Sequence, residues 1–308
     1  MYKILTRVAL AVFCLAFTIS CDSNDYEATE SGVQYKYIEK GEGEQPSQGK
    51  VVVMKFEYAT SDGKTFFDSK DLPQGNTTIV YDTTMMGQKG SIEEVISMLQ
   101  VGDSVEAKVD ASTFFQKTFN EETLPDSIPA EETIIFHIRL VEIAEREEYF
   151  GRVAREQAET DDKAIEAYIN DKNLQNVQKA DSGLRYMITK EGDGKKIEQG
   201  DSVKIDYIGY LLDGTIFDSS IEEKAREGDV YMEGRNYAPL DLMYGRTRFI
   251  AGWNEGIGYL TEGDEATLII PSGQAYGPQA RSKQIGANSI LVFELFVREV
   301  KENTNEAN

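Results

Sequence analysis

The side chains best suited to chemistry gather between residues 203 and 300. They comprise one carboxylate, Asp218, together with the hydroxyl groups of Tyr207 and Tyr276 and the only indole of the chain, Trp253. Tyrosine and tryptophan carry polar atoms that need hydrogen-bond partners when they are buried. Several such side chains around one carboxylate predict an aromatic-walled pocket with a few placed polar groups, the usual form of a small-ligand site.

The residue inventory excludes several other kinds of site. His137 is the only histidine and Cys14 and Cys21 are the only cysteines, which excludes a histidine-based triad, a zinc site and a disulfide framework in the folded part. His137 lies in the alternating run I-I-F-H-I-R-L and is predicted to face solvent. Acidic pairs such as Glu121 and Glu122 lack the oxygen spacing of a calcium loop. We therefore expect neither a metal nor a cofactor.

Five short motifs in this region resemble, in order, those of the FKBP-type peptidyl-prolyl cis-trans isomerases. Any one of them would be a weak signal, but the ordered set is specific, and the resemblance covers nearly all of 183–302. The motifs are V-K-I-D-Y-I-G at 203–209, F-D-S-S at 217–220, F-I-A-G-W at 249–253, Q-A-Y-G at 274–277 and L-V-F-E-L-F-V at 291–297.

The resemblance implies a role for each matched side chain. It implies that Asp218, Tyr276 and Tyr207 are catalytic, and that Trp253 is the floor of the pocket beneath the proline ring. The implied substrate-binding residues are Phe217, Leu240, Phe249, Ile250, Trp253, Ile285 and Phe293.

Three features depart from the pattern of that family. Leu240 stands where the family usually has an aromatic residue, Gln284 replaces one isoleucine of the flap, and Ser219–Pro239 looks like an insertion.

The implied reaction needs no nucleophile or cofactor, because prolyl isomerisation breaks no bond. Its barrier of about 18–20 kcal/mol comes from amide resonance, and uncatalysed exchange takes tens to hundreds of seconds. The resemblance implies an exported isomerase and folding factor that acts on proline-containing unfolded or nascent exported proteins, and it implies binding of macrolide-type inhibitors at the same pocket. The alternative is an FKBP-shaped chaperone or adaptor that binds chains without significant turnover.

Bulk composition narrows the class of partner. The chain has 308 residues, enough for two ordinary domains, and a formal net charge of −22 from 54 acidic and 32 basic residues. Phosphate binding needs a basic surface, so nucleic acid is excluded as a partner. A well-hydrated acidic surface is the simpler interpretation of this charge.

The N-terminus has the pattern of an export signal. Residues 1–20 combine Lys3 and Arg7 with an apolar run that is too short to span a bilayer. The run ends at Cys21 in F-T-I-S-C, which resembles a bacterial lipoprotein box except for Thr18, so an ordinary signal peptide remains an alternative. Residues 21–31 are polar and predict a flexible lipidated tether. The expected location is the cell envelope, with the protein lipid-anchored to a bacterial membrane on its periplasmic or surface side.

The chain also repeats itself with an offset of 151 residues. S-G-V-Q-Y-K-Y-I-E-K-G-E-G at 31–43 echoes S-G-L-R-Y-M-I-T-K-E-G-D-G at 182–194, and V-G-D-S-V at 101–105 echoes E-G-D-E-A at 262–266. Two copies of one fold are expected. The first copy has Phe56 in place of the pocket tyrosine, about Ile92 in place of the tryptophan and Phe115 in place of the flap tyrosine, so we expect its site to be degraded. It keeps an acid at Asp68, with an added residue before it.

These patterns predict an α+β fold in each copy, a curved antiparallel sheet around a short helix. The helix is expected from Trp253, with Ile257 and Leu260 on the same face. Charged residues at helical spacing between the copies predict one broken or two successive helices, with an N-cap at 160–162, acting as a spacer that packs in part on its neighbours. The expected domains are a degenerate FKBP-like domain at 32–144, a helical linker at 145–179, an isomerase domain at 180–302 and a disordered tail at 303–308.

Overall fold

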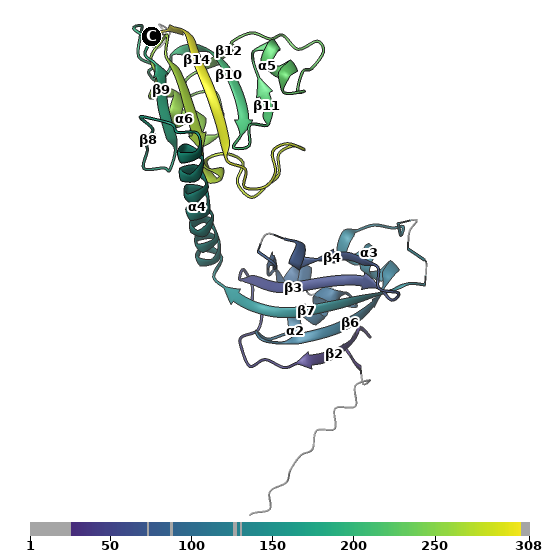
Figure 1. Ribbon diagram of the computed structural model, residues 1–308. Helices are drawn as coiled ribbons and strands as arrows, with labels where there is room; N and C mark the ends of the chain where they lie inside the picture. Colours follow the sequence, from purple (N-terminus) through teal and green to yellow (C-terminus); the bar gives the residue numbers. More distant parts are fainter. Residues whose placement is uncertain (1–25, 73, 87–88, 126–127, 130, 303–308) are drawn as a thin grey trace, which may run out of the picture. The chain divides into compact units, whose positions relative to one another are not determined.

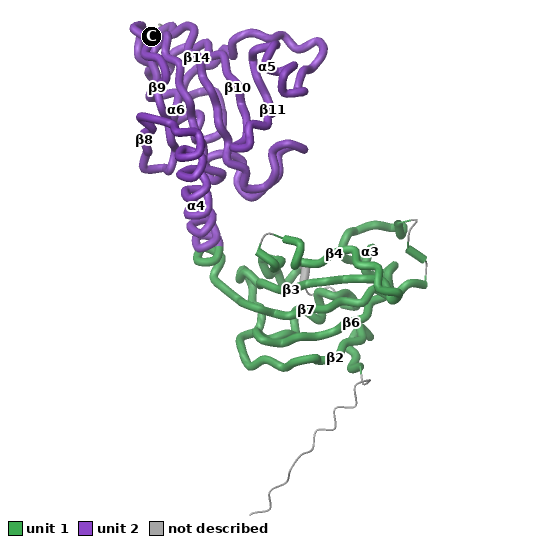
Figure 2. Tube along the Cα trace, viewed as in Figure 1, with its two compact units in different colours: residues 1–149 green, residues 150–308 purple. Residues whose placement is uncertain are grey.

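The computed structural model describes residues 26–302 except 73, 87–88, 126–127 and 130. The chain divides into two compact units, Met1–Tyr149 and Phe150–Asn308 (Figure 2). The predicted signal sequence, Cys21 and the predicted tail at 303–308 lie outside the described residues. Within the described part, no helix has both the length and the apolar character needed to cross a membrane.

The first unit is a seven-stranded antiparallel sheet with short helices packed on it (Figure 1). The strand order is β1-β2-β6-β7-β3-β4, and β5 pairs with β3 beside this path. The elements are β1 (Glu27–Ala28), β2 (Gln34–Glu39), β3 (Val51–Thr60), β4 (Thr65–Asp68), the 3₁₀ helix η1 (Ser69–Asp71), β5 (Thr77–Val80), α1 (Thr83–Met86), α2 (Ile92–Met98), β6 (Ser104–Asp110), α3 (Ala111–Phe119) and β7 (Thr133–Ala144).

The second unit repeats this topology strand for strand. The order is β8-β9-β13-β14-β10-β11, and β12 pairs with β10 as β5 pairs with β3. The predicted α+β class with two copies of one fold is therefore confirmed. The elements are α4 (Arg146–Asp171), which begins in the first unit, β8 (Gln178–Lys179), β9 (Arg185–Lys190), β10 (Ser202–Leu211), β11 (Ile216–Ser219), α5 (Glu222–Glu227), β12 (Leu240–Met243), α6 (Ala251–Ile257), β13 (Glu265–Ile270), the 3₁₀ helix η2 (Ser272–Gln274) and β14 (Leu291–Lys301).

The repeated G-D motifs hold the same corner in both units. The backbone N–H of Gly41 donates to Asp103 Oδ1 at 2.7 Å, and that of Gly192 donates to Asp264 Oδ1 at 2.7 Å. Both aspartates are almost fully buried. A buried carboxylate is tolerated only where hydrogen bonds satisfy it, so each motif fixes a loop against the start of a central strand.

Alternating burial explains the strands. In β7 the apolar residues Ile134, Phe136 and Ile138 are buried, whereas His137 between them is exposed, as the sequence predicts. This period of two is the pattern of a strand with one face in the core. The predicted helix near Trp253 is confirmed as α6, in which Trp253 and Ile257 are buried, but it ends at Ile257, so Leu260 is buried beyond the helix rather than on its face.

The region between the copies forms one continuous helix, α4, and the predicted break at 160–162 is wrong. Asp161 lies inside the helix, where its Oδ2 accepts hydrogen bonds from the N–H and the hydroxyl of Ser272 at 2.7 and 2.6 Å. The next residue, Asp162, pairs with Arg185, and Glu166 Oε1 accepts from the same guanidinium at 2.7 Å. Asp161 and Asp162 thus bind η2 and strand β9 instead of capping a helix.

The insertion begins later than the sequence suggests. Ser219 ends β11, and it and Ser220 are buried, so neither belongs to an inserted loop. Nineteen residues (221–239) join Ser220 to β12, whereas seven residues (70–76) join the corresponding Ser69 to β5. The extra residues include helix α5 and a stack of Tyr231 on Tyr237 with ring centroids 5.4 Å apart.

Candidate functional site

Five aromatic rings of the second unit meet in one cluster. The Trp253 ring lies at its centre, with centroids 5.6 Å from Tyr207, 5.0 Å from Phe249 and 5.4 Å from Phe293. Phe217 packs edge-on against Phe293 at 5.5 Å. The rings come from strands β10, β11 and β14, from helix α6 and, for Phe249, from the segment just before that helix. Residues far apart in the sequence thus form one aromatic wall.

Helix α6 presents Trp253 to this cluster because it lies unusually close to the sheet. A Cβ atom on Gly256 would lie 2.4 Å from Leu268 Cδ1, and one on Gly252 would lie 2.4 Å from Ile270 Cγ2. Only glycine permits such an approach of helix and strand. The close approach of the helix places the Trp253 indole against the sheet.

Gly209 makes room for two of the rings. A Cβ atom there would lie 2.7 Å from Phe217 and 2.8 Å from Phe293. Any side chain at this position of β10 would displace a ring. The glycine in the motif at 203–209 thus serves packing, since its φ lies outside the positive range that favours glycine, although the pairing of β10 with β11 shifts register directly after it.

A hydrogen-bonded network of three side chains lies at the edge of the cluster. The Tyr207 hydroxyl donates to Asp218 Oδ2 at 2.6 Å. The guanidinium of Arg235 donates from Nη1 to Asp218 Oδ1 at 2.6 Å and from Nη2 to the Tyr207 hydroxyl oxygen at 3.1 Å. The backbone N–H of Ser219 completes the set by donating to Asp218 Oδ1 at 2.9 Å. The carboxylate is therefore held in one orientation from three sides.

The serines of the F-D-S-S motif fix β11 against β10. The Ser220 hydroxyl oxygen accepts from the backbone N–H of Tyr207 at 2.9 Å, and the Ser219 hydroxyl donates to the Tyr207 carbonyl at 2.8 Å. These bonds set the strand register that places Asp218 opposite Gly209. Tyr207 and Asp218 consequently meet on the same face.

The surroundings of this network favour the neutral form of Tyr207 and the charged form of Arg235. Burial, and then the hydrogen bond to Asp218, raise the pKa of the Tyr207 hydroxyl above its ordinary value. Burial lowers the pKa of Arg235, but the hydrogen bond and charge of Asp218 outweigh it and the net shift is upward. A neutral tyrosine and a charged arginine therefore persist well above neutral pH.

Sequence reasoning missed Arg235. The residue lies in the stretch that was interpreted as insertion, seventeen positions after its partner Asp218. Its side chain is only 25% exposed, and the guanidinium also lies 5.2 Å from the Tyr237 ring. The sequence does show a basic residue that could partner the Asp218 carboxylate, but a separation of seventeen positions gave no reason to expect the two side chains to meet.

The remaining predicted site residues divide into two groups. Leu240, Ile250 and Ile285 pack against the core that contains Trp253. The backbone N–H of Ile250 donates no hydrogen bond to any residue of the described chain. Tyr276 is different: it is 40% exposed and is not part of that core, and its ring lies 5.6 Å from the Arg281 guanidinium. Among the predicted aromatic and aliphatic site residues, only Tyr276 lies outside the core that contains Trp253.

The first unit keeps phenylalanines, Phe66 and Phe136, where the second has Phe217 and Phe293, but it differs at the polar positions and at the glycine. By strand register Phe56 stands in place of Tyr207, Tyr58 in place of Gly209 and Phe67 in place of Asp218. Asp68, which we expected to be the retained acid, takes the place of Ser219 instead. Its carboxylate pairs with Lys70 rather than with an aromatic hydroxyl.

The described residues contain no group of three or more histidine, cysteine, aspartate or glutamate side chains arranged to hold a metal ion. The features of the site are aromatic walls, a fixed carboxylate and an unengaged backbone N–H. Such an arrangement can bind and orient a small apolar group that carries a carbonyl.

Comparison with known proteins gives consistent results. A family model described as FKBP-type peptidyl-prolyl cis-trans isomerase matches residues 193–298. A probable FKBP-type peptidyl-prolyl cis-trans isomerase FkpA of Neisseria meningitidis serogroup B is 45% identical over 114 residues, which cover 37% of this chain and 36% of that protein. The outer membrane protein MIP of Legionella longbeachae is 29% identical over 160 residues, 52% of this chain and 61% of that protein.

A shorter relative is covered almost completely. The FK506-binding protein of Neisseria meningitidis serogroup B is 33% identical over 120 residues, which are 39% of this chain and 98% of that protein. The chain spans only 36%, 45% and 61% of the first three curated relatives that it matches. Because the aromatic cluster lies within the matched region and the short relative is covered almost end to end, this chain belongs to the FKBP-type peptidyl-prolyl cis-trans isomerase family.

Proposed function

We propose that the second unit catalyses cis–trans exchange of X-Pro peptide bonds in exported proteins. The observation that carries the proposal is the Trp253 ring, buried at the centre of an aromatic cluster beside the fixed Asp218 carboxylate. A proline ring is apolar and flat enough to rest against an indole. The adjacent polar groups are then positioned for the amide that must rotate.

Catalysis in this scheme is differential binding. A planar amide is more polar than the twisted transition state, because twisting removes resonance. Transfer from water into aromatic surroundings therefore penalises the planar form more and lowers the barrier. The free N–H of Ile250 is available to hold a flanking carbonyl of the substrate. Asp218 acts through geometry, since Arg235 and Tyr207 hold its carboxylate at the edge of the pocket.

Tyr276 enters this scheme through a movement of its own side chain. Its hydroxyl was expected to donate to the substrate, yet the side chain is 40% exposed and separate from the aromatic core. The hydrogen bond from Gly277 N–H to the Ser272 carbonyl at 2.9 Å holds the base of the loop. We propose that Tyr276 closes over bound substrate by rotation of its side chain about this base.

The decisive experiment is exchange spectroscopy on a proline tetrapeptide with and without the chain 26–302. Added protein should broaden and exchange the cis and trans resonances at substoichiometric concentration. A heated, unfolded sample supplies the control. Binding of the peptide without any gain in exchange rate would instead establish the alternative function, an FKBP-shaped chaperone or adaptor.

That alternative has its own support in the first unit. Its aromatic surroundings remain, whereas the residues corresponding to Tyr207 and Asp218 are phenylalanines. We propose that the first unit binds clients or partners without turnover, while the second unit performs the isomerisation. Tethering two weak sites raises the effective concentration of a client at the second one.

We further propose that the protein is exported and held at a bacterial membrane by lipid on Cys21. The support is the apolar run that ends at this residue, together with the outer-membrane name of one relative. Wild type should incorporate labelled fatty acid and fractionate with membranes, and Cys21→Ala should do neither. Equal labelling of both proteins would remove the anchor from the proposal but leave the isomerase intact.

A further inference from the structure

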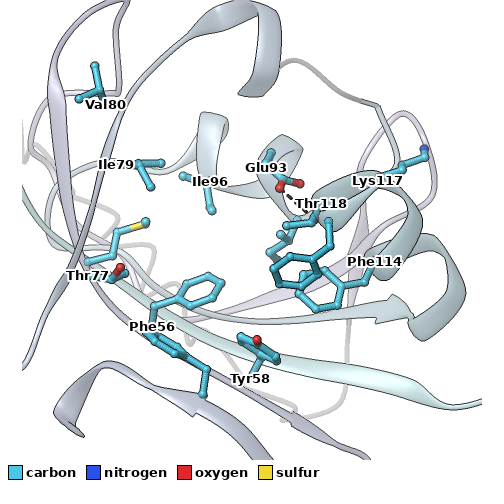
Figure 3. A pocket seen from close by; sticks show the side chains of 14 residues that line it. Phe56, Tyr58, Thr77, Ile79, Val80, Glu93, Ile96, Phe114, Lys117 and Thr118 are labelled. Atoms are coloured by element: carbon cyan, nitrogen blue, oxygen red, sulfur yellow. Dashed lines mark hydrogen bonds between the residues drawn. The ribbon is translucent and has the colours of Figure 1, made fainter. Parts of the chain in front are cut away.

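The first unit contains a cavity of about 600 Å³ on the face of the sheet that carries helices α2 and α3. Figure 3 shows Phe56 and Tyr58 of β3 on one side of this cavity and Ile96 and Glu93 of α2 on the other. Phe114 of α3 closes a third side. The cavity therefore lies where the second unit has its Trp253 cluster, but Ile92 offers much less volume than an indole.

Glu93 gives this apolar cavity an unsatisfied polar group. Its Oε1 accepts a hydrogen bond from the Thr118 hydroxyl at 3.0 Å (Figure 3). Its Oε2 is buried and has no hydrogen-bond partner among the described residues. The nearby ammonium of Lys117 donates to the Lys89 carbonyl and forms no ion pair with Glu93 among the described residues. A buried acceptor without a donor costs free energy, and a ligand that supplies the donor recovers it.

The surroundings of Glu93 favour a positively charged donor over a neutral one. The rings of Phe56, Tyr58 and Phe114 line the cavity, and the faces of aromatic rings attract ammonium and guanidinium groups. The net charge of −22 adds a long-range negative potential, which also attracts cations. The first unit has thus exchanged the Asp218 carboxylate of β11 for a carboxylate on helix α2, with no arginine bound to it.

A polymer fits this surface better than a compact molecule. A second cavity of about 720 Å³ shares Tyr58 and Phe119 as wall residues with the first, and it is lined further by Phe66, Phe115 and Leu124. Two adjoining apolar cavities accept two side chains of one extended segment. Glu121 at the outer cavity supplies further negative charge.

We propose that the first unit binds polypeptide segments in which a lysine or arginine lies beside aromatic or aliphatic residues. The basic side chain enters the cavity and donates to Glu93 Oε2, while its apolar neighbours cover Tyr58 and Phe119. This inference deepens the client-binding part of the proposed function and names the sequence class of the client. It does not require proline.

The test compares three peptides that lack both proline and tryptophan. They are acetyl-Gly-Phe-Lys-Leu-Gly-amide and its analogues with norleucine or glutamate in place of lysine. Calorimetric titration into the chain 26–302 should show the lysine peptide binding about tenfold more tightly than the norleucine peptide, as one charge-assisted hydrogen bond implies. The glutamate peptide should bind more weakly than either. Amide shifts in NMR spectra should change at residues of α2 and α3.

Matched variants identify the carboxylate. Glu93→Gln keeps an acceptor for Thr118 but removes the charge, so the lysine peptide should fall to the affinity of the norleucine peptide. Glu122→Gln removes the same charge from an exposed position outside the cavity and should leave the preference unchanged. Equal affinities for lysine and norleucine in wild type, or equal effects of the two variants, would overturn the proposal. Absence of binding by all three peptides would also overturn it, as would a dimer that buries the same residues.

The isomerase proposal for the second unit is tested independently of this inference about the first unit. The only tryptophan lies in the second unit, so Trp253 fluorescence reports that site alone. It should not respond to peptides bound in the first unit. Exchange of a short proline peptide, measured on the same Glu93→Gln sample, should equal that of wild type. A loss of exchange with retained lysine preference would contradict the isomerase and leave this inference intact.

Discussion

The two units share one topology and nearly one strand register, yet only the second has assembled a polar network inside its aromatic cluster. The difference lies in a few positions of equivalent strands. Tyr207, Gly209 and Asp218 of the second unit correspond to Phe56, Tyr58 and Phe67 of the first. Each exchange keeps or adds apolar volume, so the sheet still packs. The comparison teaches that a fold can be retained while its polar site is replaced.

One position shows how narrowly the site depends on register. Both units have an aspartate near the end of the second strand of the pair, but Asp68 lies opposite Glu57, whereas Asp218 lies opposite Gly209. Since side chains alternate between faces along a strand, a shift of one position sends the carboxylate to the other side of the sheet. Asp68 accordingly lines a polar groove with Lys70 and His137.

Expressing the two units separately should have the largest effect on isomerase activity. We expect all isomerase activity on a short proline peptide to reside in 150–302 and none in 26–149, because only the second unit holds the tyrosine–aspartate–arginine network. The intact chain should exceed 150–302 on an unfolded protein but not on the peptide. Exchange spectroscopy and refolding kinetics measure the two activities. Comparable peptide turnover by 26–149 would contradict the division of labour.

Removal of the central indole should have the next largest effect. Trp253 is 3% exposed, so Trp253→Ala should lower the free energy of unfolding of the second unit by about 3–5 kcal/mol and abolish turnover. Ile92→Ala is the matched change in the first unit and should destabilise only that unit, with turnover unchanged. Chemical denaturation followed by circular dichroism resolves the two transitions. A fully active, folded Trp253→Ala protein would show that the indole is not the pocket floor.

Loss of the site carboxylate should have a smaller effect. The Asp218 side chain is 39% exposed, so Asp218→Ala should cost transition-state stabilisation near the lower end of about 1–3 kcal/mol, a decrease of up to about tenfold in kcat/KM. Asp68→Ala is the control, because that carboxylate faces away from the aromatic cluster. Both variants should retain the wild-type circular dichroism spectrum. Equal rates for wild type and Asp218→Ala would remove this residue from the mechanism.

The smallest expected difference between the units is in how their stability falls at acid pH. Hydrogen bonds from Lys179 and then Arg185 lower the pKa of Asp162. The stabilisation is therefore present above the ordinary aspartate pKa of about 4 and is lost as the pH falls through the lowered value. The first unit has exposed Gln34 where the second has buried Arg185, so it lacks this contribution. The Asp162→Asn variant should flatten the stability curve of the second unit below about pH 4, as measured by thermal unfolding. An unchanged curve would show that the pair contributes nothing.

The linker shows where local patterns mislead. Residues 160–162 have the composition of an N-cap, and helix propensity alone cannot tell such a cap from a helical interior whose polar groups have distant partners. Here Ser272 and Arg185 supply those partners from more than twenty residues away. The helix therefore continues through the predicted break.

The sequence by itself determined the repeat, the α+β class and the aromatic set around Trp253, because alternating apolar residues and ordered motifs are local properties of a chain. Only the tertiary structure decided that Arg235 holds Asp218, that Phe67 rather than Asp68 faces the first cavity, and that Glu93 Oε2 is left without a donor. These outcomes depend on strand register and on loops that return from far along the chain. Spacing in the sequence cannot predict whether two such side chains meet, because they come into contact only once the sheet has formed.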